Sequence, residues 1–389
     1  MLSPLNGRHR IFGLIMVVSF FTASGEVLAT TNPKDTETLI AMAVTELIKM
    51  QDTDGAWPYE GVYRVRGEIP IGYRVGGTAL VCEAILHATS AEDITAVKSL
   101  ERGIEFILEG LEDPLMAPST RNRYDVRIWG HAYALEFFCQ YRAAGREGPN
   151  RRSIDEWISR LVATIVQEEL PSGGWHYANR RRHASFVTAP VTQALLWARF
   201  RGAEVPAAVF DRARNILAQS RLPSGAFHYS GTKKSASANS PTSAVAGSIA
   251  RSAVCEATLS LLGGGSADAV GKSVDAFYEH WDELEKRRKK HGTHVGPYGI
   301  APYYFYFGHR YAAQAIELLT PEVRPRERAR LHQVLLRTRD VDGTWNDRVF
   351  PRSRNYGTAM AVLALLADRV PLPHALSPAG TPIHASPDH

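Results

Sequence analysis

The feature that most constrains the fold of this 389-residue chain is a turn that recurs along it. Each copy follows a helical stretch, contains a glycine and ends on an aromatic residue. The four clear copies lie at residues 51–57, 170–175, 222–227 and 340–345. Glycine tolerates the positive φ that lets a chain leave a helix and reverse direction. The chain is therefore expected to consist of repeated antiparallel helix pairs.

A second recurring series supplies the other helix of each pair. Six segments rich in Ala, Leu and Val open near residues 77, 130, 187, 250, 308 and 357, and they are too apolar all round for surface helices. Amphipathic, charged segments separate them, near residues 36–51, 91–110, 152–169, 207–220, 268–288 and 324–338. This alternation predicts an all-α fold, an (α/α)6 toroid of six inner and six outer helices. An open helical solenoid is the alternative architecture.

The two ends of the chain differ from the repeats. Arg8 and Arg10 precede an apolar stretch at 11–23, and Val27 to Ala29 has the small-residue spacing of a signal peptidase site. We expect residues 1–29 to be a signal peptide cleaved after Ala29, so that the protein is exported to the periplasm or secreted. An uncleaved membrane anchor is the alternative. Residues 30–370 are expected to form the toroid, and the proline-rich residues 371–389 a disordered tail.

Charge and cysteine content exclude several classes of protein. Lys and Arg number 45 against 40 Asp and Glu, and no basic run is interleaved with aromatic residues, so a nucleic-acid partner is not expected. The three cysteines, Cys82, Cys139 and Cys255, lie far apart in apolar segments and are expected to be buried thiols. Because no clustered metal-binding motif occurs, we expect neither a metal nor a cofactor.

The repeat turn and the helix starts resemble a known superfamily. Residues 51–57, with Gln51 and Trp57, look like the QW repeat of the squalene cyclases and prenyltransferases, and residues 77–80 and 356–360 look like that superfamily's inner helices. The resemblance covers residues 36–367. It implies a terpenoid cyclase-like toroid that binds an isoprenoid or another apolar ligand in its central cavity.

The catalytic motifs of that superfamily are absent. No Asp-x-Asp-Asp, the acid of squalene-type cyclases, occurs in the chain. The resemblance matches Asp342 to a zinc-binding aspartate of the protein prenyltransferases, but Thr344 and Gly357 stand where the cysteine and the histidine should be. Whether the toroid is an enzyme is therefore left open.

Candidate site residues come from the starts of the inner helices. Their second positions are expected to face the cavity, and His131 and His309, three units apart, to face each other across the ring. His131, His309 and Asp125 are the catalytic candidates. Histidine at a helix N-terminus is favoured in its neutral form, which can exchange a proton. The residues expected to contact a ligand are Arg74, Thr78, Arg127, His131, Arg251, Tyr303, Tyr304, His309, Tyr356 and Thr358.

Two further functions fit the same sequence. One is a toroid that binds a small ligand or a protein without catalysis. The other is a glycan-active α/α barrel, which needs two facing carboxylates. Asp125 and the glutamates of the inner helices, such as Glu83 and Glu136, are the groups available for that chemistry.

Overall fold

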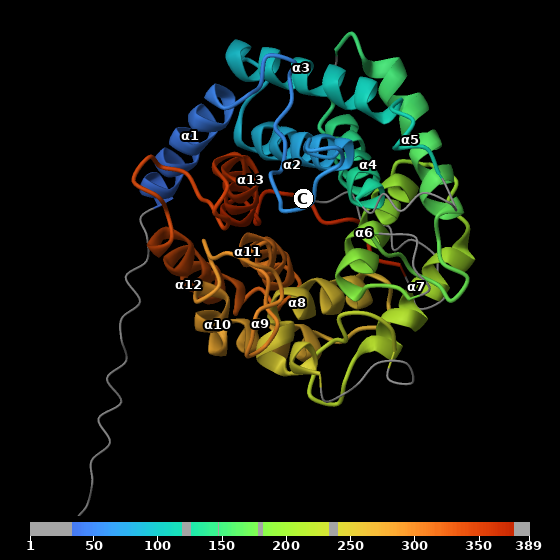
Figure 1. Cartoon of the computed structure of the whole chain (residues 1–389), viewed down its shortest axis with the longest axis vertical. Coiled ribbons are helices and arrows are strands. Elements are labelled where there is room, and N and C mark those ends of the chain that lie inside the picture. The colour runs from blue at the N-terminus through green and yellow to red at the C-terminus, as the bar shows by residue number, and fades with distance from the viewer. Residues whose placement is uncertain (1–32, 119–125, 147, 178–181, 233–239, 377–389) are drawn as a thin grey trace, which may run out of the picture. The chain divides into compact units, whose positions relative to one another are not determined.

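The computed structural model describes residues 33–118, 126–146, 148–177, 182–232 and 240–376 (Figure 1). The expected signal peptide lies outside the described residues. The described residues form α-helices and two short 3-10 helices, and their only β-pairing consists of isolated bridges. None of these helices is long and apolar enough to cross a membrane.

Six inner helices form a closed ring. They are α2 (Ile71–Ala88), α4 (Arg127–Ala143), α6 (Ser185–Phe200), α8 (Val245–Leu261), α11 (Tyr304–Ile316) and α13 (Arg354–Leu365). Each contacts the next, and α13 returns to contact α2 (Figure 1). This closure confirms the (α/α)6 toroid predicted from the repeats and excludes the open solenoid.

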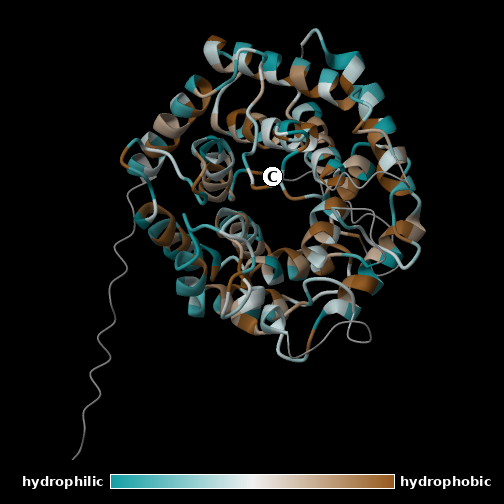
Figure 2. Cartoon of the chain, viewed as in Figure 1, coloured by the Kyte–Doolittle hydropathy of each residue, from teal (hydrophilic) through white to brown (hydrophobic). Residues whose placement is uncertain are grey.

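The outer layer consists of the amphipathic helices. They are α1 (Pro33–Lys49), α3 (Ile94–Leu111), α5 (Arg151–Gln167), α7 (Ala207–Ser220), α9 (Ala267–Glu279) with the short α10 (Trp281–Glu285), and α12 (Arg324–Arg337). In Figure 2 these helices alternate between hydrophilic and hydrophobic residues. On α3, for example, Leu100, Ile104 and Ile107 are buried on one face. The inner helices are buried on nearly every side, because they pack between the outer layer and the ring axis.

The repeat turns join the two layers in one recurring geometry. The indole N–H groups of Trp57, Trp175 and Trp345 each donate to a carbonyl ten residues earlier, over 2.6, 2.8 and 2.9 Å. Gly55 has a φ of +90°, and a Cβ there would lie 2.4 Å from a carbonyl oxygen of α3. The glycine turn is therefore required by backbone conformation and by the close approach of an outer helix.

The C-terminal part of the described chain packs against this ring. The Leu376 N–H donates to the Leu261 carbonyl over 2.7 Å, and the His374 ring stacks on Phe200 with centroids 3.8 Å apart. Residues 371–376, which we expected in the tail, thus contact the helices, and residues 377–389 lie outside the described part. Cys82, Cys139 and Cys255 are buried free thiols.

Candidate functional site: an aromatic pocket at the ring axis

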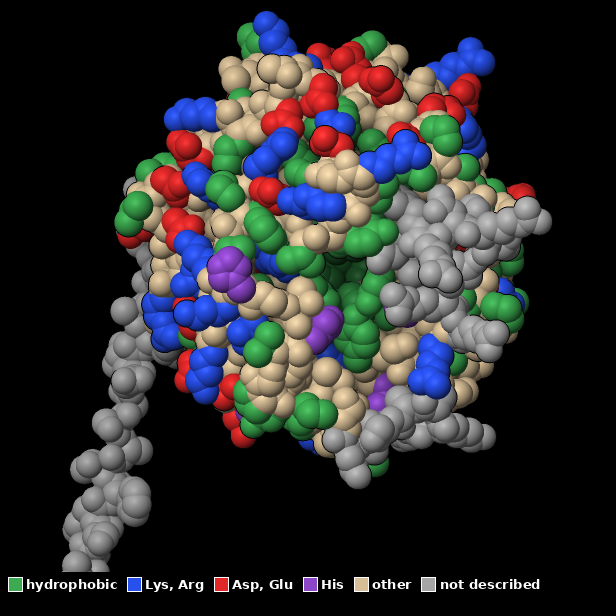
Figure 3. All heavy atoms as spheres, in the orientation of Figure 1, with side chains coloured by type: hydrophobic (Ala, Val, Ile, Leu, Met, Phe, Trp, Pro, Cys, Tyr) green, Lys and Arg blue, Asp and Glu red, His purple; other side chains and the backbone are tan. Residues whose placement is uncertain are grey.

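A cavity of about 310 Å³ opens at the centre of the ring. Figure 3 shows a hollow there, lined by side chains of the hydrophobic class, to which tyrosine is assigned. The inner helices α2, α4, α6, α11 and α13 and the loops after the repeat turns supply its walls. The aromatic residues that line it are Tyr59, Tyr73, Trp129, Tyr133, Tyr177, Phe186, Tyr303, Tyr304, Phe307 and Tyr356.

Ring-to-ring contacts fix these walls. Trp129 is the hub of one side, with its ring centroid 4.9 Å from Tyr133 and 5.5 Å from Tyr73. Tyr59 lies 4.6 Å from Tyr356 on the neighbouring wall. Edge-to-face and tilted pairs at such distances hold one another's rotamers, so the pocket is formed before any ligand enters.

The pocket's polar groups are mainly tyrosine hydroxyls. The Tyr177 and Tyr229 hydroxyls lie 2.8 Å apart, and the Tyr303 hydroxyl lies 3.2 Å from Nε2 of His294. Burial raises the pKa of Tyr303 and Tyr304 well above the ordinary value, so both stay neutral. The walls therefore offer apolar ring faces together with neutral groups that donate and accept hydrogen bonds.

Residues from opposite helices meet beside the pocket residue Tyr133. The hydroxyls of Tyr133 on α4 and Tyr311 on α11 lie 3.3 Å apart. Near these rings, Nη2 of Arg310 lies 2.7 Å from Oε1 of Glu83 and 3.1 Å from Oε1 of Glu136. Burial raises the pKa of Glu136 to about 8, although Arg310 opposes the shift. This ion cluster ties three inner helices together.

Three of the residues expected to contact a ligand line the pocket, namely Tyr303, Tyr304 and Tyr356. The threonines at the second positions of the inner helices face the repeat turns instead. Thr78 and Thr358 accept hydrogen bonds from the backbone N–H groups of Trp57 and Trp345 over 2.9 and 3.0 Å. Each threonine therefore anchors the turn that precedes its own helix.

The arginines of the expected site also serve the turns. Arg251 donates to the carbonyls of Phe227 and Gly247 over 3.0 and 2.7 Å. Arg127 donates to the Ala117 carbonyl over 2.6 Å, and Arg74 pairs with Asp54. None of the three is among the residues that line the pocket.

The two histidines lie against the outer layer and do not line the pocket. His309 accepts from the Trp281 indole N–H at Nε2 over 2.8 Å, and its Nδ1 lies 2.7 Å from the Phe305 carbonyl. Burial lowers the pKa of His309 to about 4, so the ring is neutral. Nδ1 of His131 lies 3.5 Å from Oε2 of Glu168. We expected both imidazoles to face one cavity, whereas neither of them lines the pocket.

The difference is one of helical phase. Units two and five do face each other across the ring, through Tyr133 and Tyr311 rather than His131 and His309. Two residues rotate a helix by about 200°, which turns the histidines outward when the tyrosines face the axis. The catalytic candidate Asp125 lies outside the described residues, directly before Val126, which lines the pocket.

A repeated signal marks pocket residues that the helix starts did not reveal. In three of the four clear turns, the residue two positions after the turn aromatic is a tyrosine: Tyr59 after Trp57, Tyr177 after Trp175 and Tyr229 after Phe227. The first two line the pocket, and the third has its ring centroid 5.1 Å from the pocket residue Phe186. Among the described residues, no group of three or more His, Cys, Asp or Glu side chains could hold a metal ion.

The ring and its cavity define the chain as an (α/α)6 toroid with an aromatic pocket at the axis. No protein-family profile matches the sequence, and no curated protein matches it. Among solved structures, the chain is similar to an inactive variant of GH76A α-1,6-mannanase from Salegentibacter sp. HEL1_6 in complex with α-1,6-mannotriose. The two share 11% identity over 85% of this chain and 100% of the mannanase, with a TM-score of 0.53.

Two more solved structures match the same fold. An inactive variant of the same mannanase in complex with α-1,6-mannotetrose has 10% identity over 85% of this chain and 98% of that one, with a TM-score of 0.55. The Lin0763 protein from Listeria innocua has 14% identity over 85% and 96%, with a TM-score of 0.53. At such identities the likeness shows the fold alone.

These neighbours correct the superfamily expectation. The chain's structural likeness is to mannanase-type (α/α)6 toroids, and the resemblance to squalene cyclases and prenyltransferases is wrong, as is the isoprenoid-binding function that it implied. The reason lies in the motifs themselves. The glycine turn, the aromatic that covers a helix end and the threonine at position 78 all serve to join inner and outer helices. Any α/α ring has that need, whatever it binds.

Proposed function

We propose that this toroid binds a carbohydrate in its aromatic pocket. The observation that carries the proposal is the pocket wall itself, where aromatic faces alternate with neutral tyrosine hydroxyls. Sugar rings present apolar C–H faces and a rim of hydroxyl groups, which such a wall complements. The structural likeness to a mannanase in complex with mannooligosaccharides supports the same class of ligand. Export, proposed from residues 1–29, would place the protein where extracellular glycans occur.

Binding is favoured over hydrolysis by the residues that line the pocket. Glycoside hydrolysis uses two carboxylates, and no Asp or Glu is among the described lining residues. The mannanase variants in the matched structures are inactive after replacement of two consecutive aspartates, and this sequence contains no two consecutive aspartates. Hydrolysis is the second candidate, because Asp125 directly precedes the pocket residue Val126.

Calorimetric titration with short oligosaccharides of mannose, glucose, xylose and N-acetylglucosamine tests the proposal. We expect the wild-type protein to bind at least one of them and Trp129→Ala to weaken that binding strongly, because Trp129 contacts four other wall aromatics. Phe200→Ala is the matched control, since Phe200 is a half-exposed aromatic outside the pocket. Absence of binding to every sugar would contradict the proposal, and release of shorter products would favour hydrolysis.

A further inference from the structure

The pocket occupies only one end of the ring. Its lining residues on the inner helices all belong to the first two turns of their helices, and the furthest along are Tyr133 of α4 and Val191 of α6. The inner helices are 12 to 18 residues long. Among the described residues, no later position of these helices lines the cavity. The cavity therefore extends from the helix starts through part of the depth of the ring.

Side chains joined across the axis fill the ring beyond the pocket. The hydroxyls of Tyr133 and Tyr311, which are each 1% exposed, lie 3.3 Å apart between α4 and α11. Further along the helices, the side-chain amides of Gln193 on α6 and Gln314 on α11 donate to each other over 2.9 and 2.7 Å. The Arg310 ion pairs join α11 to α2 and α4. Because these bonds link helices that are not neighbours in the ring, they cross the axis and close the cavity at this end.

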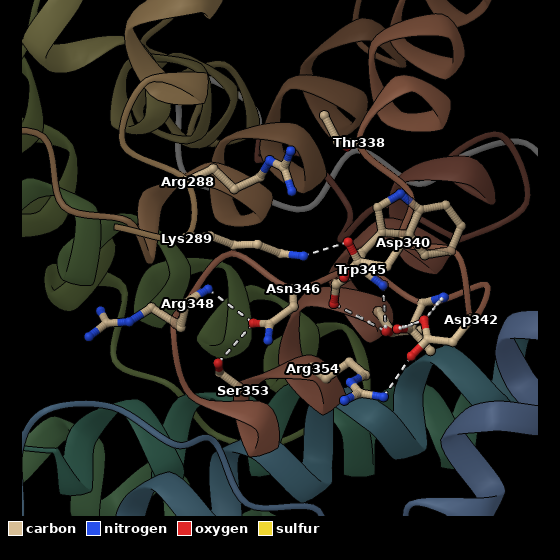
Figure 4. Close-up of polar contacts among 12 residues, drawn as sticks. Arg288, Lys289, Thr338, Asp340, Asp342, Trp345, Asn346, Arg348, Ser353 and Arg354 are labelled. Atoms are coloured by element: carbon tan, nitrogen blue, oxygen red, sulfur yellow. Dashed lines mark hydrogen bonds and ion pairs between the residues drawn. The ribbon is translucent and has the colours of Figure 1, made fainter. Parts of the chain in front are cut away.

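One side wall of the pocket is backed by a buried loop. Asp347 and Arg348, which follow the sixth repeat turn, are 0% and 2% exposed, and the Arg348 guanidinium carbon lies 6.0 Å from the ring centroid of the lining residue Tyr303. The Asn346 side chain accepts from the Arg348 N–H over 3.0 Å and from the Ser353 hydroxyl over 2.9 Å (Figure 4). These bonds hold the loop in place behind the wall.

The mouth of the pocket lies at the starts of the inner helices. Val62, in the loop before α2, lines the pocket and is 56% exposed. Thr293 and the exposed His294 line it from the loop between α10 and α11. Figure 3 looks into this opening. Within the described part of the chain, the pocket thus has exposed residues at its mouth and buried, cross-linked residues at its other end.

We propose that the pocket binds the end of a glycan chain, with the terminal sugar inside and the rest of the chain leaving through the mouth. A chain bound through an internal segment must leave the site in two directions, which needs a groove rather than a cavity closed at one end. The volume of about 310 Å³ is at the lower limit of ligand pockets, roughly 300–1,000 Å³, and suits a short part of a chain. This inference rests on the proposed carbohydrate binding and names the part of the glycan that enters.

The stoichiometry of binding to chains of different length tests the proposal. The full-length protein is titrated with α-1,6-mannotriose and with a long linear α-1,6-mannan of known chain length. A linear chain has one reducing and one non-reducing end, so a pocket that accepts one kind of end should bind one protein per chain for both ligands. If another sugar of the panel binds in place of mannose, its trisaccharide and its linear polymer are the probes.

A variant that fills the closed end of the pocket gives a second test. Ala132, in the second turn of α4, lines the pocket and is 3% exposed. Ala132→Leu should weaken binding of both ligands by roughly 10-fold or more, because the added side chain takes the space of the terminal sugar. Ala207→Leu is the matched control, since Ala207 is exposed on the outer helix α7, and it should bind as the wild type does. Thermal melts show whether each variant folds.

The outcomes separate chain-end binding from the wider proposal. Several proteins on each long chain, or a long chain that does not bind although the trisaccharide does, would overturn chain-end binding and leave carbohydrate binding intact. Unchanged binding by Ala132→Leu would also overturn it, because the ligand would not reach the closed end. If the wild type binds no sugar of the panel, the proposed function is overturned and this inference with it. Should Ala132→Leu fail to fold, the stoichiometry alone decides.

Discussion

Some buried side chains in this ring lower the stability of the folded state. Asp347 is the clearest case, because burial raises the pKa of its carboxyl to about 7, against the opposing charge of Arg348. A cost of this kind is common at binding sites, where stability is lost in exchange for function. Its size can be measured through its dependence on pH.

The charge on Asp347 should make the stability of the protein pH-dependent. The pKa of Asp347 in the folded protein is about 7, above the ordinary 3.8, so the folded state favours the protonated form. Its stabilising contribution is complete below pH 4 and is lost as the pH rises through 7. At pH 8, Asp347→Asn should therefore have a free energy of unfolding higher than that of the wild type by on the order of a few kcal/mol, and it should unfold at a higher denaturant concentration. At pH 4 the two proteins should differ little.

The groups facing Asp347 do not reverse that expectation. They are Arg348, Arg288, Tyr59, Tyr306 and Tyr356. Burial raises the pKa of the three tyrosines and holds them neutral across this range. Urea melts of both proteins from pH 4 to 8 measure the difference. An identical difference at every pH would show that Asp347 does not titrate in this range.

His309 illustrates a buried histidine with a structural role. Both ring nitrogens are engaged, with the Trp281 indole and the Phe305 carbonyl. His309→Ala should destabilise the protein by about 1–3 kcal/mol, because the indole N–H loses its acceptor. Sugar binding should be unchanged. Thermal melts and calorimetry on one preparation give both results, and a loss of binding without a loss of stability would assign His309 to the ligand site.

At the scale of the helix pair, a hydroxyl at the start of the inner helix holds each clear turn. The hydroxyls of Thr78, Thr188, Ser248 and Thr358 accept from the N–H of the turn aromatic over 2.8 to 3.1 Å. In repeat four this hydroxyl belongs to Ser248. The comparison of the helix starts predicts Arg251 for this position, three residues further along the chain.

Removing one of these hydroxyls should destabilise the ring without changing its shape. Thr78→Val keeps the volume but leaves the Trp57 N–H buried and unpaired, which should cost about 1–3 kcal/mol. Thr45→Val on the exposed face of α1 is the matched control and should change stability little. Chemical denaturation compares the two variants, and equal midpoints would mean that the turn does not depend on this bond.

At the scale of the whole ring, the Arg310 cluster links helices that are not sequence neighbours. Arg310 on α11 meets Glu83 on α2 and Glu136 on α4, which lies across the ring. Removing one member of a buried ion cluster leaves the others uncompensated. The cluster should therefore act as a single cooperative element of the toroid.

Arg310→Met should lower the free energy of unfolding by about 3–5 kcal/mol, because it leaves two buried carboxylates without a cation. Adding Glu83→Gln and Glu136→Gln to Arg310→Met should restore much of that loss, since the uncompensated charges are then gone. Denaturant melts of the single and triple variants measure both effects. A triple variant no more stable than Arg310→Met would show that the charges are not the cause.

The sequence by itself determined the architecture of this protein. The repeat of glycine turns and the alternation of apolar and amphipathic segments are local patterns, and each dictates a helix pair through backbone conformation and burial. Six such pairs in succession lead to a closed ring. The tyrosines at 303, 304 and 356 were also found from their place at the mouths of inner helices.

Only the tertiary structure decided which side of each inner helix faces the axis. Because these helices are apolar nearly all round, their hydropathy carries no phase, and a shift of two residues exchanges His131 for Tyr133 at the pocket. The superfamily resemblance was wrong for a related reason, since its motifs report how two layers join rather than what the cavity binds. The partnerless carboxylate of Asp347 likewise emerges only when distant segments pack around it. Local patterns specify helices and turns, whereas a site depends on side chains that only long-range packing brings together.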